Sequence, residues 1–334
     1  MPRAPLFRRT RSLLALSVSA LTLAAGCGML SWEGSQSAPV MPGPLKRAKV
    51  TVGVLPIVDA AAVHMAIKKG YFKAEGLEVE LKNLAGGAAA IPGMANGELQ
   101  FAFGNYVSFF AAQSKKVLDI TLIADGYQAR PHVFMIVAAR GSGIARPQDL
   151  AGKKIAINTK NNIVELTTRA TLEAAGVDMK TVTFVEVPFP DMRTGLERKN
   201  FDAAFMVEPF ITQAERLAGV TAVADPASGP TNEIPIAGWA ASAKFTKENP
   251  RTVAAFQRAI VKGQRDCANR TDVEDLVTAY ANVERQTASL LHLGTWPLTL
   301  EPARLQRVAD LMKTYGVLTG PLDVKAMIYT APSS

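Results

Sequence analysis

The spacing of hydrophobic residues alternates between two patterns, and these predict strands and helices in turn from residue 50 onward. Residues 50–56 (VTVGVLP) form a short apolar run rich in β-branched side chains, which is typical of a buried strand. The segment 59–69 is predicted to be a helix, because Asp59 can cap its start and Gly70 can end it. A strand followed closely by a helix is the unit that the rest of the chain repeats.

The same strand–helix order occurs twice along the chain. The first set has further strands at 77–84, 101–104, 118–125 and 132–139, and helices at 87–95 and 106–113. The second set has strands at 153–158, 181–187, 201–207 and 220–225, and helices at 163–175, 191–199 and 209–217. The repeat predicts an α/β fold with two lobes built on mainly parallel sheets. The remainder is expected to be mostly helical, at 252–268, 271–282, 285–293, 301–315 and 321–329.

The first residues have a different pattern, in which a basic stretch precedes an apolar run at 13–25 and small residues precede Cys27. This order is typical of a secretory signal peptide, and the run is shorter than the roughly 20 residues of a membrane span. The ending L-A-A-G-C resembles a bacterial lipoprotein signal, although Leu23 lies four places before the cysteine and Ala24 occupies the usual leucine position.

We therefore expect residues 1–26 to be removed and Cys27 to carry a lipid, to which each buried CH₂ adds ~0.8 kcal/mol of membrane affinity. Ordinary secretory cleavage beside an incidental cysteine is the alternative. Residues 27–47 are rich in Gly, Ser and Pro, and they are predicted to form a flexible tether. The expected location is the extracytoplasmic face of the cell membrane.

Composition narrows the function classes. A chain of 334 residues that is 48% hydrophobic can bury a large core and suggests two domains. Losing the four arginines of the signal would lower the formal net charge from +8 to +4, and no basic stripe or helix-turn-helix pattern indicates nucleic-acid binding. The sequence has no C-x-x-C pair and no H-E-x-x-H, so no metal site is expected.

Three motifs together make the chain recognisable: KGYFKAEGL at 69–77, DLAGKKIA at 149–156 and FDAAFMVEPF at 201–210. With the ending at 309–329, they resemble periplasmic binding proteins of the nitrate/sulfonate/thiamine-precursor family over about 49–330. Gln100 departs from that family, which commonly has Asp there. The resemblance implies the type II periplasmic-binding-protein fold, with a hinge and C-terminal helices. It also implies an ABC permease and ATPase as partners, with no catalysis and no cofactor.

The first lobe is expected to be discontinuous in sequence, because the strand–helix order repeats while the helical tail occurs once. The first lobe would comprise 48–136 plus 238–334, and the second lobe 137–237. A monomer is expected. In such a fold, ligand groups lie at the carboxyl ends of strands, beside helix N-termini. This rule selects the candidate ligand-binding residues.

Three strand ends of the first lobe supply candidates. Asp59 can accept a hydrogen bond from a ligand amine or amide, or it can cap its helix. Gly86 and Gly87 allow a ligand to approach the backbone closely, or they form a tight turn. Asn105 and Tyr106 can orient and stack a polar ring, although Asn105 is equally suited to capping.

In the second lobe, Asn158, Thr159, Asn161 and Asn162 surround the first strand–helix turn, where they exceed what one helix cap needs. At least one of them is expected to bind ligand. Glu208 follows the strand at 201–207 and precedes a proline. It either serves the geometry of the fold there or contacts the ligand.

Trp239 lies in the predicted return crossing between lobes, either as packing beside the hinge or as a lid on the pocket. Arg193 is expected at the surface, with pairing to an acidic ligand as the alternative, and His64 is expected to be packed or solvated. The favoured residues include two acids and no cation, which favours an amine-bearing solute or nitrogen heterocycle over a sulfonate or nitrate. Backbone amides at the helix N-termini can bind an anion without a cationic side chain, so an anionic solute remains the alternative.

Catalysis is disfavoured, since the chain has no G-x-S-x-G, no P-loop and no G-x-G-x-x-G. Some enzymes share the fold, but a yeast-type pyrimidine synthase would need a cysteine-rich motif that is lacking here. An extracytoplasmic sensor subunit that binds the same ligands remains an alternative to import.

Overall fold

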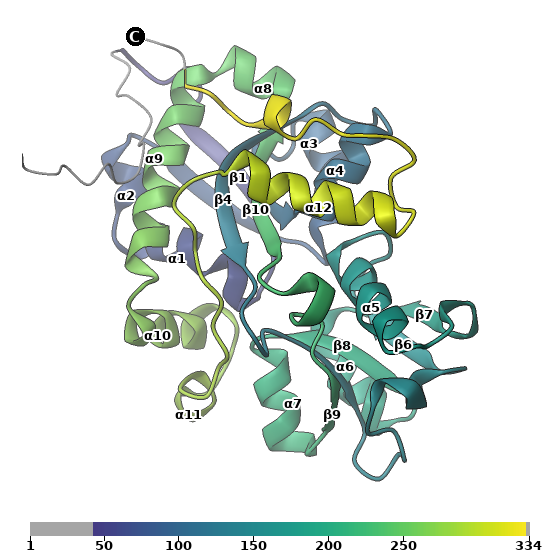
Figure 1. Cartoon of the computed structure of the whole chain (residues 1–334). Helices are drawn as coiled ribbons and strands as arrows, with labels where there is room; N and C mark the ends of the chain where they lie inside the picture. The colour runs from purple at the N-terminus through teal and green to yellow at the C-terminus, as the bar shows by residue number, and fades with distance from the viewer. Residues whose placement is uncertain (1–42, 332–334) are drawn as a thin grey trace, which may run out of the picture. The chain divides into compact units, whose positions relative to one another are not determined.

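The computed structural model describes residues 43–331 (Figure 1). The predicted signal peptide, the lipidated Cys27 and the tether up to residue 42 lie outside the described residues. The described chain folds into two five-stranded sheets with helices packed around them. No helix within residues 43–331 combines the length and the apolar character needed to cross a membrane.

The first sheet has the strand order β2-β1-β3-β10-β4. Its strands are β1 (Lys49–Val54), β2 (Glu78–Asn83), β3 (Phe101–Asn105), β4 (Ile120–Gln128) and β10 (Pro235–Ser242). Strand β1 is parallel to β2 and β3, whereas β10 runs antiparallel between β3 and β4. Strand β10 was predicted only as a return crossing. All eight of its residues are buried, because they fill the space between two strands.

The second sheet repeats this arrangement in the order β7-β6-β8-β5-β9. Its strands are β5 (Phe134–Ala138), β6 (Lys154–Ile157), β7 (Thr183–Glu186), β8 (Ala203–Val207) and β9 (Thr221–Ala224). Strand β6 is parallel to β7 and β8, and β5 runs antiparallel between β8 and β9.

The two-sheet α/β fold is confirmed, and four of the five strands in each sheet run in the same direction, in line with the expectation of mainly parallel sheets. In each sheet one antiparallel strand, β10 or β5, is inserted at the fourth position, so both sheets are mixed. These two strands carry the chain into and out of the second sheet. The crossings themselves lie at residues 129–133 and 225–234, so the boundaries expected at 136/137 and 237/238 fall inside strands.

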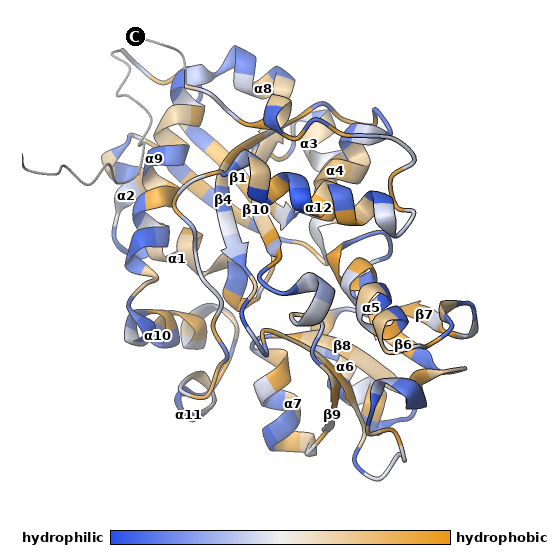
Figure 2. Cartoon of the chain, in the orientation of Figure 1, coloured by the Kyte–Doolittle hydropathy of each residue, from blue (hydrophilic) through white to orange (hydrophobic). Residues whose placement is uncertain are grey.

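Twelve α-helices occur in residues 43–331. They are α1 (Ala61–Lys68), α2 (Tyr71–Ala74), α3 (Ala90–Asn96), α4 (Tyr106–Ser114), α5 (Ile163–Ala174), α6 (Phe189–Glu197), α7 (Phe210–Ala218), α8 (Ala243–Glu248), α9 (Pro250–Asp266), α10 (Arg270–Tyr280), α11 (Arg285–Ala288) and α12 (Pro302–Thr314). Figure 2 shows hydrophobic and hydrophilic residues along α12, whose buried positions 305, 308, 309 and 312 have helical spacing.

Two predicted tail helices are wrong in extent. The helix expected at 285–293 stops at Ala288, because the chain beyond it turns away to contact the second sheet through His292. The segment 321–329 contains only the short 3-10 turn Lys325–Met327. Asp59 does not cap a helix either, since it lies inside a 3-10 turn, Val58–Ala60, that has no side-chain cap.

Helix α9 crosses α1 at very short range, at Gly263. A Cβ atom on Gly263 would lie 2.3 Å from the Ala62 carbonyl oxygen and 3.0 Å from the Ala66 Cβ. Nearby, Phe256 of α9 stacks on Phe101 of β3 with ring centroids 3.8 Å apart. Because Gly263 has no side chain, α9 can pack closely on α1.

We predict that Gly263→Ala destabilises the protein. The added methyl would force the helices apart, and overpacking of this kind costs about 1–3 kcal/mol, more than the gain of up to about 1 kcal/mol in helix propensity. Thermal unfolding should show a Tm lower by several degrees. The matched control is Gly320→Ala, where a Cβ would have no atom within 4 Å. An unchanged Tm for Gly263→Ala would contradict the close packing.

Candidate ligand-binding site

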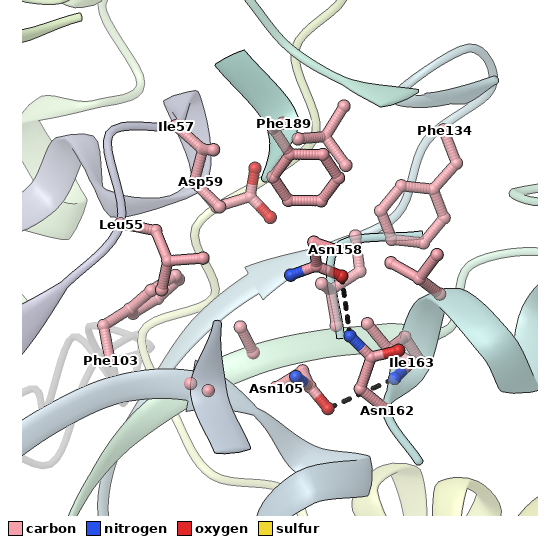
Figure 3. Close-up of a pocket in the computed structure, with 16 residues that line it drawn as sticks. Leu55, Ile57, Asp59, Phe103, Asn105, Phe134, Asn158, Asn162, Ile163 and Phe189 are labelled. Atoms are coloured by element: carbon pink, nitrogen blue, oxygen red, sulfur yellow. Dashed lines mark hydrogen bonds between the residues drawn. The ribbon is translucent and has the colours of Figure 1, made fainter. Parts of the chain in front are cut away.

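A small cavity of about 30 Å³ lies between the two sheets, at the ends of their strands (Figure 3). Its walls on the first-sheet side are Leu55, Ile57, Asp59, Gly87, Phe103, Gly104, Asn105, Ile236 and Ala237. On the second-sheet side they are Phe134, Asn158, Asn162, Ile163, Val164, Phe189 and Val207. The strand ends of both sheets thus meet at one small cavity.

Asp59 is the ionisable residue of this lining, and it comes from the turn between β1 and α1. Its side chain is nearly buried, with 4% exposed, and Figure 3 shows the carboxyl group pointing between Phe189 and Asn158. Burial raises the pKa of Asp59 to about 7, against a hydrogen bond from its own backbone that lowers it, and the charge of Glu208 adds to the rise. The Asp59 carbonyl accepts a bond of 3.1 Å from the Trp296 indole, which fixes the turn.

Asn105 connects the two sheets through a single side-chain oxygen. Its Oδ1 accepts 2.9 Å from the Ser108 backbone N–H and so caps α4. The same oxygen accepts 3.2 Å from the backbone N–H of Ile163, the first residue of α5 in the second sheet's half. Gly87 packs against this residue so closely that a Cβ there would lie 2.9 Å from the Asn105 backbone nitrogen. The glycine therefore makes room for Asn105.

Asn158 and Asn162 form the opposite wall. Asn162 caps α5 by accepting 3.2 Å from the Glu165 N–H, and its amide donates 2.8 Å to Asn158 Oδ1 and 2.9 Å to Thr159 Oγ1. The Asn158 amide donates 3.3 Å to the Ala85 carbonyl across the cavity. Asn162, which the sequence grouped with its neighbours, thus organises this wall.

Five of the residues named from the sequence line the cavity: Asp59, Gly87, Asn105, Asn158 and Asn162. The other predicted residues lie outside the lining. Tyr106 is fully buried and donates 2.7 Å to Asp125 Oδ1 inside the first half. Trp239 is also fully buried and packs on Phe103, with centroids 4.9 Å apart.

Three further predicted residues lie near the cavity without lining it. The half-buried Thr159 accepts from Asn162, and the exposed Asn161 donates 2.8 Å from its backbone to Glu165. Glu208 is 2% exposed, and its carboxylate accepts from the Thr212 N–H and hydroxyl and from the backbone N–H of His292.

The apolar walls were not anticipated. Phe103, Phe134 and Phe189 line the cavity together with aliphatic side chains. Phe189 begins α6 directly after the end of β7, and Ile57 follows β1, so the strand-end rule that selected Asp59 could have found both. Among the described lining residues none is Lys, Arg or His. The site offers one carboxyl group, three side-chain amides and apolar faces.

Further contacts hold the halves together beside the cavity. The Val58 N–H donates 3.1 Å to the Glu208 carbonyl. His292, from the chain after α11, lies 3.1 Å from Glu208 Oε1, and this hydrogen bond raises the pKa of His292. Arg216 of α7 donates 2.8 Å to Gln286. Within residues 43–331, no cluster of three or more His, Cys, Asp and Glu side chains could hold a metal ion.

Comparison with protein families gives one match. The model of the family described as NMT1/THI5 like matches residues 58–272, which include every lining residue except Leu55 and Ile57. A search of curated proteins finds no match.

Solved structures share the fold across nearly the whole described chain. The alkanesulfonate-binding protein SsuA from Xanthomonas axonopodis pv. citri, bound to MOPS, aligns with a TM-score of 0.72 and 13% identity, covering 86% of this chain and 99% of that chain. The nitrate-binding protein NrtA from Synechocystis PCC 6803 aligns with a TM-score of 0.70 and 14% identity, covering 85% and 86%. The Candida albicans CA3427 product aligns with a TM-score of 0.70 and 17% identity, covering 85% and 96%.

We predict that Asp59→Asn changes the pH dependence of stability. The folded pKa of about 7 lies above the ordinary value of 3.8, so Asp59 favours folding below about pH 4 and this contribution is lost as the pH rises to 7. Relative to Asp59→Asn, the wild-type Tm should therefore fall by several degrees between pH 5 and pH 8. Equal pH profiles for the two proteins would contradict a desolvated carboxyl at this position.

Proposed function

Because the chain belongs to the NMT1/THI5-like family, we propose that it is an extracytoplasmic substrate-binding protein of an ABC importer. It captures a small polar solute in the cavity between the sheets and delivers it to a permease and an ATPase. One observation carries this proposal: hydrogen-bonding groups from both sheets converge on a single small cavity. The names of the relatives, an alkanesulfonate-binding and a nitrate-binding protein, are consistent with solute capture.

Binding would work by closure of two hinged lobes. One lobe contains the first sheet and the other the second, and the chain passes between them at 129–133 and 225–234. A solute that contacts both walls favours the closed arrangement, because it gains those contacts only there. The bonds of Asn105 and Asn158 across the cavity form in that same state. The solute is pyrimidine-like or amine-like, or sulfonate-like or nitrate-like.

Import is favoured over two alternatives. The cavity lining has no Ser, Cys, His or Lys, so it presents no nucleophile beside a base, and this disfavours an enzyme. A sensor subunit would bind the same solutes and signal instead; a permease gene and an ATPase gene beside this one would favour import. Mass spectrometry of small molecules released from the purified protein would identify the solute.

The protein is further proposed to be a monomer, held at the membrane surface by a lipid on Cys27. The L-A-A-G-C pattern supports this anchor.

We predict that Cys27→Ser releases the protein from membranes, because the thiol that would accept the lipid is lost. Fractionation of cells that produce the variant should move the protein from the membrane to the soluble fraction. Cys267→Ser is the control, since Cys267 is buried in the folded domain. Membrane retention of Cys27→Ser at the wild-type level would contradict the lipid anchor.

We predict that Asn105→Ala weakens solute binding beyond its effect on folding. The variant loses the cap of α4 and the bond to Ile163 across the cavity, so closure should be less favourable by about 1 kcal/mol and affinity lower by roughly fivefold or more. Calorimetry with the identified solute measures the affinity, and solution scattering measures the compaction.

The control for this prediction is Asn269→Ala. Asn269 caps α10 through the N–H groups of Thr271 and Asp272, away from the cavity. Both variants should lower the free energy of unfolding by about 0.5–2 kcal/mol, and the Tm with it. Only Asn105→Ala should weaken binding. A wild type that shows no compaction with saturating solute would overturn the hinged mechanism.

A further inference from the structure

We infer that the cavity selects a small nitrogen cation, such as a protonated amine or amidine, and that the Asp59 carboxylate binds its charge. This inference rests on the proposed function and names the class of its solute. Four observations support it: the charge of the lining, the hydrogen bonds already made at the start of α5, the groups that surround Asp59, and the aromatic walls.

The lining has one ionisable side chain, and that side chain is acidic. Asp59 lies with its carboxyl group directed into the cavity, and among the described lining residues no Lys, Arg or His faces it. An ionised carboxylate in a closed, largely apolar space is costly without a partner. A cationic solute supplies that partner, whereas a nitrate or sulfonate would have to bind beside the carboxylate or require it to be protonated.

Two of the first three backbone N–H groups of α5, which could bind an oxyanion, are already engaged by side chains. The first N–H of this helix, from Ile163, donates to Asn105, and the N–H of Glu165 donates to Asn162. The Asn162 amide donates to Asn158 and Thr159. An anion at this helix N-terminus would have to displace side-chain oxygens that fit it well, whereas the Asp59 carboxylate remains available as an acceptor.

Ionisable groups on the neighbouring elements do not neutralise Asp59. Glu208, after β8, adds negative charge, and its own carboxylate is engaged by Thr212 and His292. Tyr127 of β4 and Tyr280 of α10 are neutral, since burial raises the pKa of both well above 10. His64 of α1 stacks on Tyr280 at 3.8 Å, and burial lowers its pKa to about 4, so it is uncharged at pH 7.

Three aromatic walls complete a cation site. Phe103, Phe134 and Phe189 line the cavity, and Figure 3 shows the Phe189 ring beside the Asp59 carboxyl group. A cation over a phenyl face gains about 0.5–2 kcal/mol, more as it is desolvated. An anion would gain nothing comparable from the same faces, because the ring face carries negative potential.

Proton exchange distinguishes the two classes of solute. Closure raises the pKa of Asp59 to about 7 through burial. Closure over a cation keeps the carboxylate ionised, so binding takes up no proton. Closure over an anion requires Asp59 to be protonated, so binding takes up about one proton per site at pH 7.

The test is calorimetry of the purified chain at pH 7 in buffers of different ionisation enthalpy, which yields both affinity and proton uptake. The cation probes are methylammonium and guanidinium, which are fully protonated at pH 7, and the anion probes are nitrate and methanesulfonate. Variants are Asp59→Asn and Phe189→Leu, with Asp119→Asn as control because Asp119 is exposed and lies outside the cavity lining.

The inference predicts that at least one cation probe binds without proton uptake, and that Asp59→Asn weakens it tenfold or more. Phe189→Leu should weaken it roughly threefold or more, which keeps the test decisive if Asp59→Asn fails to fold, and Asp119→Asn should leave it unchanged. Tighter binding of an anion, with or without proton uptake, equal cation binding by Asp59→Asn, or failure of every cation probe overturns the inference. Failure of both probe sets, with no small molecule released on denaturation, overturns solute binding itself.

Discussion

Backbone N–H groups at the start of a helix need an acceptor, and this requirement holds the site together. The Asn105 side chain meets it for two helices at once, α4 beside the first sheet and α5 beside the second. Asn162 also accepts a hydrogen bond from a backbone N–H at the start of α5, and its amide donates hydrogen bonds to Asn158 and Thr159. The strand ends of the two sheets are thus linked through capping side chains, and the cavity is the space that they leave.

Much of this architecture follows from the hydrophobic pattern, since apolar runs with β-branched residues located nearly every strand and most helices. The pattern could not assign β10, because Pro235–Ser242 contains mostly small residues that indicate burial but not secondary structure. Nor could it give strand direction, since an antiparallel strand buried on both faces has the same composition as a parallel one. The mixed sheets follow from where the chain crosses, which is a property of the whole fold.

The strand-end rule located Asp59, Gly87, Asn105 and Asn158 beside the cavity, because the ends of parallel strands meet at one edge of a sheet. It could not say which way a side chain points once a helix begins. Tyr106 directly follows Asn105, yet its hydroxyl reaches into the first half to Asp125. Trp239, similarly, occupies the inner side of a central strand, where its ring packs on Phe103. The sequence therefore predicts the place of the site better than its lining.

The strands of the second sheet are consecutive in sequence, whereas those of the first sheet are not, and this difference determines which sheet can be completed first. All five strands of the second sheet come from one stretch, between Phe134 and Ala224, but the first sheet is incomplete until β10 is inserted between β3 and β4. As the polypeptide emerges during synthesis, β4 is made before its hydrogen-bonding partner, and residues up to 242 must appear before that edge can close. The first sheet must therefore wait, while the second can assemble from consecutive chain. The first sheet is therefore completed last, after every strand of the second sheet has appeared.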